Sequence, residues 1–320
     1  MFKAVDAIEE SLKLFETGRL FEKILEFLKN KWKDFKCRLF KKILRKIAQE
    51  KPEDYSRIVY PAKKEKTAHN EKRNNKSEVI NDLISRGVQI KKQGNEVIEE
   101  EEAEKLYGIY KYMGEKYEHI SHFLHKLRSS FSGKEATLNM KTFTDKEITY
   151  SCQLASKLFE IGYLDFYKYF KSPKFIMKFR VCNFQKALSF ITGKWLEFYI
   201  GNLLEKELKK QNISYSLLKN PVVDLPWGRR FEMDLVLKVA DEFFWLEIKS
   251  GQYKSYINKY KQIGQRLSIK PENQYLVVAE ETEDIVNQLS DYHEYNILNL
   301  EMFKRNLSEM FILNNETKAA

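Results

Sequence analysis

The sequence of 320 residues is poor in cysteine, glycine and proline, and it has no long apolar run. Its cysteines, Cys37, Cys152 and Cys182, are odd in number and widely spaced. They offer neither a disulfide framework nor a zinc-ligand pattern, which fits a reducing compartment. Only 12 Gly and 6 Pro argue against a low-complexity chain. No run of 18 apolar residues exists, and the N-terminal MFKAVDAIEESLKLF has acids where a signal peptide needs an apolar core. We therefore expect a cytoplasmic protein without a transmembrane segment.

Apolar residues, by contrast, are plentiful. Hydrophobic residues make up 43% of the chain and aromatic residues 14%, which predicts a folded protein with a substantial core and room for two or more domains. The formal charge is +10, yet residues 1 to 76 alone hold 21 Lys and Arg against 12 Asp and Glu. The rest of the chain is therefore nearly balanced. This asymmetry indicates an anionic partner for the N-terminal part, either nucleic acid or a membrane surface.

Residues 1 to 60 form a basic region that we predict to be helical. Between residues 20 and 48, apolar side chains recur every three or four positions, and ten Lys and Arg face three acids on the remaining positions. Three interpretations fit this pattern: a solvated face of a helical bundle, contact with phosphates, or binding to a membrane surface. Residues 61 to 78 contain almost nothing that could be buried, and we predict a flexible linker there.

Two further regions precede the C-terminal part of the chain. Residues 79 to 135 are predicted to be mainly helical, with a weak hairpin over 86 to 98 and a helix over 99 to 128. From residue 140 the pattern is clearer, because Thr144 and Glu147 form a capping box before an apolar-periodic stretch.

Residues 140 to 183 continue with an antiparallel strand pair, at 164 to 170 and 175 to 181. A helix followed by such a hairpin resembles the second half of a winged helix. In that case the basic residues of the hairpin could contact nucleic acid: Lys171, Lys174 and Arg180. A winged helix that serves only as a spacer or a dimer contact would look the same.

Residues 184 to 320 predict an α/β domain with a mixed sheet flanked by helices. A long helix over 183 to 210 comes first, with Asn183 as its predicted cap. We predict strands at 222–225, 229–239, 242–249, 274–279 and 297–300, and helices at 253–267, 283–289 and 301–313.

The long helix has an unusual feature around Glu197. Gly193 and Gly201 lie inside the helix, where each costs roughly 1 kcal/mol relative to alanine, and they flank Glu197 by one turn on each side. Either another backbone or a substrate passes close to the glutamate, or the glycines simply allow close packing.

Charged residues also interrupt two predicted strands that otherwise look buried. Asp234 lies in the middle of the strand at 229–239, and the next strand, apolar from Phe243, ends in Glu247-Ile248-Lys249. A hairpin would bring the two carboxylates and the lysine together at one edge of the sheet. Buried strands rarely carry charges without a reason, so this hairpin predicts a functional site.

Such a cluster suits a hard divalent cation. Two carboxylates and the backbone carbonyl of Ile248 can hold Mg²⁺ or Mn²⁺, with a further oxygen from Glu197 or Glu232. The cation would activate water and offset charge on a phosphate. Lys249 lies on the same sheet face as Glu247 and could stabilise the charge that develops during hydrolysis. A salt bridge at a sheet edge is the simpler alternative, but it leaves the second carboxylate unexplained.

The order Glu197, Asp234, Glu247-x-Lys249 resembles the core of the PD-(D/E)xK nuclease superfamily. Within it, the chain is most similar to the nuclease domains of CRISPR-ancillary effectors. Gly193-Lys-Trp-Leu-Glu197 is similar to their G-x-W-L-E helix motif, and Leu246-Glu-Ile-Lys-Ser250 to their E-C-K-T turn. Glu232-Met-Asp234 is similar to their N-E-x-D strand, although Phe231 stands where Asn is expected. The likeness covers about residues 140 to 300.

This resemblance implies metal-dependent endonucleolytic hydrolysis of phosphodiester bonds, with DNA favoured over RNA, a role in antiviral defence and a homodimer in double-strand cutting. It also implies phosphate contacts from the helix after the hairpin, through Gln262, Gln265 and Arg266. It does not extend to the N-terminal half, because no Rossmann-like strand–helix alternation of a cyclic-oligonucleotide sensor (CARF) domain is present there. The alternative is a catalytically silent nucleic-acid-binding or regulatory protein that keeps the nuclease fold.

Overall fold

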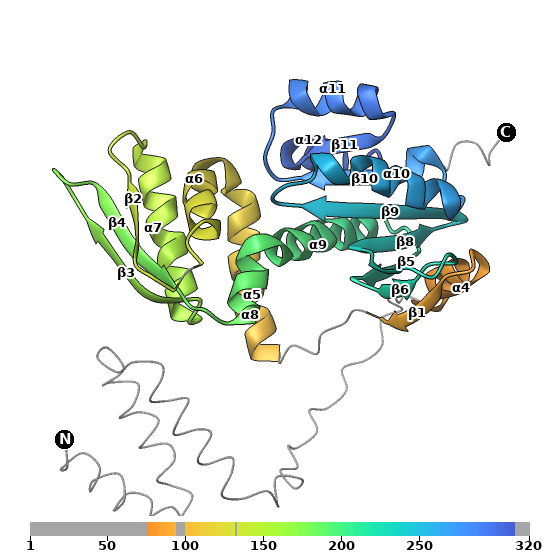
Figure 1. Cartoon of the computed structure of the whole chain (residues 1–320), viewed down its shortest axis with the longest axis horizontal. Helices are drawn as coiled ribbons and strands as arrows, with labels where there is room; N and C mark the ends of the chain where they lie inside the picture. The colour runs from red at the N-terminus through yellow and green to blue at the C-terminus, as the bar shows by residue number, and fades with distance from the viewer. Residues whose placement is uncertain (1–75, 94–99, 132, 311–320) are drawn as a thin grey trace, which may run out of the picture. The chain divides into compact units, whose positions relative to one another are not determined.

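The computed structural model describes residues 76–93, 100–131 and 133–310. These residues form an α/β fold in which a mixed sheet is flanked by helices (Figure 1), which confirms the class predicted for the C-terminal part. The predicted basic helices of residues 1–60 lie outside the described residues. So does the predicted linker at 61–78, except for its last three residues, which begin helix α4 (Lys76–Ser85). No helix among the described residues is both long and apolar enough to cross a membrane.

The central element is a five-stranded sheet in which β9, β10 and β11 run parallel, and β8 and β5 are antiparallel to their neighbours. The mixed character predicted from the sequence is therefore confirmed. Strand β5 was not predicted, because its sequence YSLLK is short and lacks alternation. In spatial order the strands are β11 (Asn296–Asn299), β10 (Gln274–Val278), β9 (Glu242–Lys249), β8 (Leu235–Val239) and β5 (Tyr215–Lys219).

Helices cover both faces of this sheet, as Figure 1 shows for α9 (Trp195–Lys210) and α10 (Ile257–Arg266) on either side of β9. The Tyr260 ring of α10 lies 6.1 Å from the Trp245 ring, so α10 packs on the face that carries Trp245 and Glu247. On the other face, a Cβ at Gly201 of α9 would lie 3.5 Å from Leu235. The helices after the hairpin are α10 (Ile257–Arg266), α11 (Glu283–His293) and α12 (Leu300–Asn306).

A second, smaller sheet corrects two predictions. It has the order β1 (Gln89–Lys92), β6 (Val222–Asp224) and β7 (Arg230–Glu232). The strand predicted at 229–239 is therefore two strands in two sheets. The chain changes sheets at Met233-Asp234, where the Met233 amide donates to the Pro221 carbonyl (3.1 Å). The hairpin predicted at 86–98 is also wrong for β1, since β1 pairs with β6 instead.

The helices before the third sheet are α5 (Glu100–Glu115) and α6 (Tyr117–Arg128). They replace the single helix predicted at 99–128, because the backbone leaves the helical region at Lys116 (φ −112°, ψ 14°). The next helix, α7 (Asp145–Glu160), has the predicted capping box: Thr144 Oγ1 accepts from the Glu147 amide, and Glu147 Oε2 accepts from the Thr144 amide.

The third sheet has the order β2 (Ala136–Asn139), β4 (Ile176–Val181) and β3 (Leu164–Phe170), all antiparallel. The two predicted strands are confirmed as β3 and β4, and β2 adds a third strand that the sequence pattern did not indicate. The inner face of this sheet packs on α6, since the Phe123 and Phe179 rings meet edge to face at 5.4 Å.

The long helix predicted at 183–210 is not a uniform α-helix. It consists of α8 (Gln185–Ser189), a π-helical turn at Phe190–Lys194 and α9 (Trp195–Lys210). The predicted cap, Asn183, is not the first flanking residue. That position belongs to Phe184, whose side chain makes no capping bond. The wide π turn directly precedes α9, whose first turn carries Leu196 and Glu197, and such turns are frequent at functional sites.

Candidate active site

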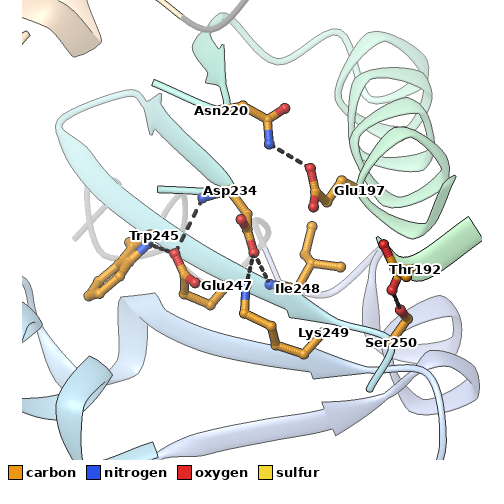
Figure 2. Close-up of polar contacts among 9 residues, drawn as sticks. All are labelled: Thr192, Glu197, Asn220, Asp234, Trp245, Glu247, Ile248, Lys249 and Ser250. Carbon is orange, nitrogen blue, oxygen red and sulfur yellow. Dashed lines mark hydrogen bonds and ion pairs between the residues drawn. The ribbon is translucent and has the colours of Figure 1, made fainter. Parts of the chain in front are cut away.

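The charged residues singled out in the sequence come together at the junction of the two sheets (Figure 2). Glu247 and Lys249 lie at the carboxyl end of β9. Asp234 lies in the chain segment that connects β7 to β8, and Glu197 extends toward it from the first turn of α9. Three separate stretches of chain thus contribute the four side chains.

Asp234 is the centre of the cluster. Its Oδ2 accepts from the Ile248 amide (2.7 Å) and from the Lys249 ammonium (2.6 Å). Its own amide donates to Glu247 Oε1 (3.3 Å). Because Asp234 stands in the gap between strands, its backbone is free to make this contact instead of a ladder bond. The prediction that Asp234 lies within a strand was wrong, but its proximity to the end of β9 was right.

Glu247 is the most deeply buried member of the cluster, with 1% of its surface exposed. Its Oε1 accepts from the indole Nε1 of Trp245 (3.1 Å), which lies two residues earlier on the same sheet face. Its Oε2 forms an ion pair with Lys249 (3.1 Å). The Lys249 ammonium therefore lies between two buried carboxylates and neutralises one charge of the two.

Asn220, between β5 and β6, connects Glu197 to Asp234. The Asn220 side-chain amide donates to Glu197 Oε2 (2.5 Å), and its backbone amide donates to the Asp234 carbonyl (2.8 Å). Asn220 has a left-handed backbone (φ +52°), which asparagine adopts more easily than most residues. A single turn residue thereby fixes one carboxylate and the backbone of another.

The π turn ties α9 to the end of β9. Ser250 Oγ, one residue after Lys249, donates to the Thr192 carbonyl inside that turn. A Cβ at Gly193 would lie 3.8 Å from Glu197 Oε1 and 3.9 Å from Ser250 Oγ, which is ordinary contact. At Gly201 a Cβ would come within 3.4 Å of Lys219. Of the two interpretations of these glycines, close packing fits Gly201.

Burial and mutual repulsion shift the pKa values of the cluster. Burial, and then the charge of Asp234, raises the pKa of Glu197 to about 7. The same two causes raise the pKa of Glu247, to about 8. Burial opposes the charge of Lys249, but the carboxylates of Glu247 and Asp234 outweigh it and raise the pKa of the lysine. At neutral pH Glu247 and part of Glu197 therefore hold a proton, and a further cation in the site would favour the ionised form of both glutamates.

The donors present suit Mg²⁺ or Mn²⁺, which prefer hard oxygen ligands. Asp234, Glu247 and Glu197 supply carboxylates. The Ile248 carbonyl faces the same strand edge as its amide, which bonds Asp234. As the side chains stand, no three His, Cys, Asp or Glu in the described ranges are grouped closely enough to hold a metal ion.

The remaining predicted residues lie away from the cluster centre. Glu232 is exposed on β7, and its charge contributes to the raised pKa of Glu197. Gln262, Gln265 and Arg266 are exposed on α10, and Lys171 and Lys174 are exposed in the turn between β3 and β4. Arg180 is different, because its guanidinium pairs with Asp165 (2.6 Å).

Asn220, Trp245 and Tyr260 also belong to the site, although the prediction from the sequence did not include them. The Tyr260 ring, buried beneath α10, lies 5.7 Å from the Lys249 ammonium. Trp245 could have been found, since strand alternation places it on the face of Glu247. Nothing local to Asn220 or Tyr260 indicates that either approaches the site.

Comparison with known proteins adds little. No protein-family model matches the chain, and no curated protein matches it. A solved structure described as "Crystal structure of protein VC1899 from Vibrio cholerae" matches with 15% sequence identity and a TM-score of 0.48. The match covers 75% of this chain and 60% of that one.

Proposed function

We propose that this protein is a divalent-metal-dependent endonuclease with a PD-(D/E)xK-like active site, acting on DNA rather than RNA. The observation that carries the proposal is the buried cluster of Asp234, Glu247 and Lys249, with Glu197 approaching from α9. Two carboxylates with a lysine held between them are costly to bury, and burial also raises the pKa of Glu247. Active sites are where such arrangements concentrate.

In this proposal, Asp234, Glu247, Glu197 and the Ile248 carbonyl would hold Mg²⁺ or Mn²⁺. The bound ion would neutralise charge on the phosphate and activate a water. Lys249 stays protonated at neutral pH, since the neighbouring carboxylates raise its pKa. Its ammonium therefore serves as a fixed positive charge that orients the attacking water and stabilises the pentacovalent phosphate. Trp245 and Asn220 hold the carboxylates Glu247 and Glu197 in place.

The third sheet with α7 supports a second part of the proposal, a winged-helix-like segment that contacts nucleic acid or a second copy of the chain. Lys171 and Lys174 remain candidates for phosphate contact. Arg180 is a weaker one, because Asp165 already neutralises it. The basic region of residues 1–60 would add phosphate contacts.

One observation favours the alternative, a silent protein that keeps the nuclease fold. Lys249 already bonds both Asp234 and Glu247, so the cluster forms an ion network without a metal. The two functions differ in one outcome. Purified protein with Mg²⁺ or Mn²⁺ should cut plasmid DNA or a single strand, and Asp234→Ala should abolish cutting. The matched control is Asp165→Ala, which removes an aspartate at the same 2.6 Å distance from a cation. If wild type and Asp234→Ala behave alike on DNA and RNA substrates, the protein is not an enzyme of this kind.

A further inference from the structure

Aromatic rings and cations gather on α10 and on the chain leading into β7, beside the cluster. We call this set the α10 wall: Trp227, Arg229, Phe231, Tyr256, Lys259 and Arg266. Lys259, Gln262 and Arg266 share one face of the helix, since they are spaced i, i+3 and i+7.

Lys259 stands at the middle of the wall. Its ammonium lies 4.9 Å from the centre of the Phe231 ring, 5.7 Å from Tyr256 and 5.9 Å from Tyr260. Further along the helix, the Arg266 guanidinium lies 5.0 Å from the Trp227 ring. Burial, and then the charge of Arg229, lowers the pKa of Lys259. These distances are those of cation–π contacts.

The rings also form a path from the site to solvent. The Lys249 ammonium lies 5.7 Å from the Tyr260 ring, and Tyr260 stacks on Tyr256 at 6.3 Å with an interplanar angle of 25°. Tyr260 is buried, whereas Tyr256 is 44% exposed. The outer ring of a stack that reaches the Lys249 ammonium is thus accessible to a ligand.

The cations of the wall differ from their neighbours in lacking acidic partners. Within the described ranges, none of Arg229, Lys259 and Arg266 forms an ion pair with a carboxylate. By contrast, Lys261 on the same helix pairs with Glu294 (2.9 Å), and Lys270 just beyond it pairs with Glu242 (2.6 Å). Positive charge is left unneutralised only on the side of α10 that borders the site.

We propose that the α10 wall is a nucleotide subsite, in which a base of the nucleic-acid strand stacks on Tyr256 while Lys259 and Arg229 contact its flanking phosphates. The subsite rests on the proposed function, because it guides the strand toward Lys249. Stacking of a base on an exposed aromatic ring is tolerant of sequence but requires that the base be unpaired. Cations beside the ring supply the salt-dependent share of binding.

The test is binding without cleavage. Anisotropy of a labelled oligothymidylate is measured in EDTA for wild type, Tyr256→Ala, Tyr256→Phe and Lys259→Ala. We expect Tyr256→Ala to weaken binding roughly ten-fold and Tyr256→Phe to preserve it. Lys259→Ala should lower the slope of log affinity against log salt by about 0.7. Two control variants remove the same residue types outside the α10 wall: Tyr292→Ala, at an 82% exposed tyrosine on α11, and Lys261→Ala.

An abasic strand of the same length separates stacking from charge. On it, Tyr256→Ala should bind like wild type. The proposal is overturned if Tyr256→Ala and Tyr292→Ala bind thymidylate equally, or if wild type binds neither strand. It is also overturned if Tyr256→Ala weakens binding of the abasic strand as much as binding of thymidylate. If the protein cleaves DNA but the variants of the α10 wall bind like wild type, the subsite proposal fails and the proposed enzyme function stands. If binding depends on the α10 wall but no cleavage occurs, the proposed enzyme function fails and the subsite proposal stands.

Discussion

Two hairpin regions of this protein each hold an ion pair between a basic residue and an aspartate, one pair largely buried and the other exposed to solvent. In the β8–β9 hairpin region, Lys249 lies 2.6 Å from Asp234. In the β3–β4 hairpin, Arg180 lies 2.6 Å from Asp165. The side chains of the first pair are 27% and 8% exposed, and those of the second are 42% and 33% exposed. Distance is therefore not what separates a candidate active site from an ordinary surface contact.

The two ion pairs differ in how many protein partners each of their side chains has, because buried polar groups must be satisfied within the protein. Asp234 also accepts the Ile248 amide and donates its own amide to Glu247, and Lys249 serves a second carboxylate. Without water, every lone pair and charge needs a partner in the protein, so the buried pair grows into a network. The exposed pair is completed by solvent and contributes little energy.

The largest effect that separates the two hairpins should come from removing the cation. Lys249→Met leaves two buried carboxylates without a counter-charge. We expect it to lower the free energy of unfolding at pH 8 by about 3 kcal/mol and to reduce cleavage by about 10²- to 10³-fold. Arg180→Met should cost less than about 1 kcal/mol. Urea unfolding and plasmid cleavage measure both quantities. Equal losses of stability for the two variants would contradict the contrast.

A second, smaller difference should appear in the pH dependence of stability. The Glu197 carboxyl loses its proton near pH 4.5 in the unfolded chain but only near pH 7 in the folded protein. Between these values the unfolded state binds fewer protons, so the free energy of unfolding falls as pH rises. For Glu197, whose side chain is partly exposed, we expect a decline of about 2 kcal/mol in metal-free protein.

Glu197→Gln should remove this share of the decline, and Asp165→Asn should leave it unchanged. Thermal unfolding in EDTA at several pH values between 4.5 and 7.5 measures it. A wild-type curve that is parallel to the Glu197→Gln curve would show that Glu197 ionises normally in the folded protein.

The smallest effect concerns Asn220, whose side-chain amide stabilises the ionised form of Glu197. Asn220→Gly keeps the left-handed backbone and removes that donor. The pKa of Glu197 should then rise further, moving the acidic limb of the pH–rate profile upward by about one pH unit. Asn212→Gly is the matched control, since Asn212 has φ +55° but is exposed at the end of α9. Identical profiles for the two variants would exclude this role.

Local patterns were sufficient for part of this architecture. The apolar runs of β9 and β10, the capping box at Thr144 and the charged end of β9 are encoded within a few residues each, and the structure has all three. The mixed sheet followed from them. The Glu197, Asp234, Glu247 and Lys249 set was chosen from chain order and strand geometry, and the structure brings those four side chains together.

The errors occurred where distant residues decide the local structure. Apolar residues stand at every second position from Phe231 to Val239, which is typical of one strand, but the bonds that Asn220 and Met233 donate accompany its division between two sheets. The π turn before α9 has no local sequence signature beyond Gly193, because the group that bonds its Thr192 carbonyl is the hydroxyl of Ser250, far along the chain. Asn220 itself carries no periodicity at all.

The indole of Trp245 gives the site an optical property. Trp245 is fully buried, and its Nε1 donates to Glu247 Oε1 (3.1 Å). Gain or loss of charge on that carboxylate changes the electric field at the ring, and indole emission responds to such fields. Intrinsic fluorescence should therefore change when Mn²⁺ or a proton reaches Glu247, and Trp245→Phe should remove the change. Trp245 is thus an unlabelled probe of Glu247, the most buried carboxyl among the described residues.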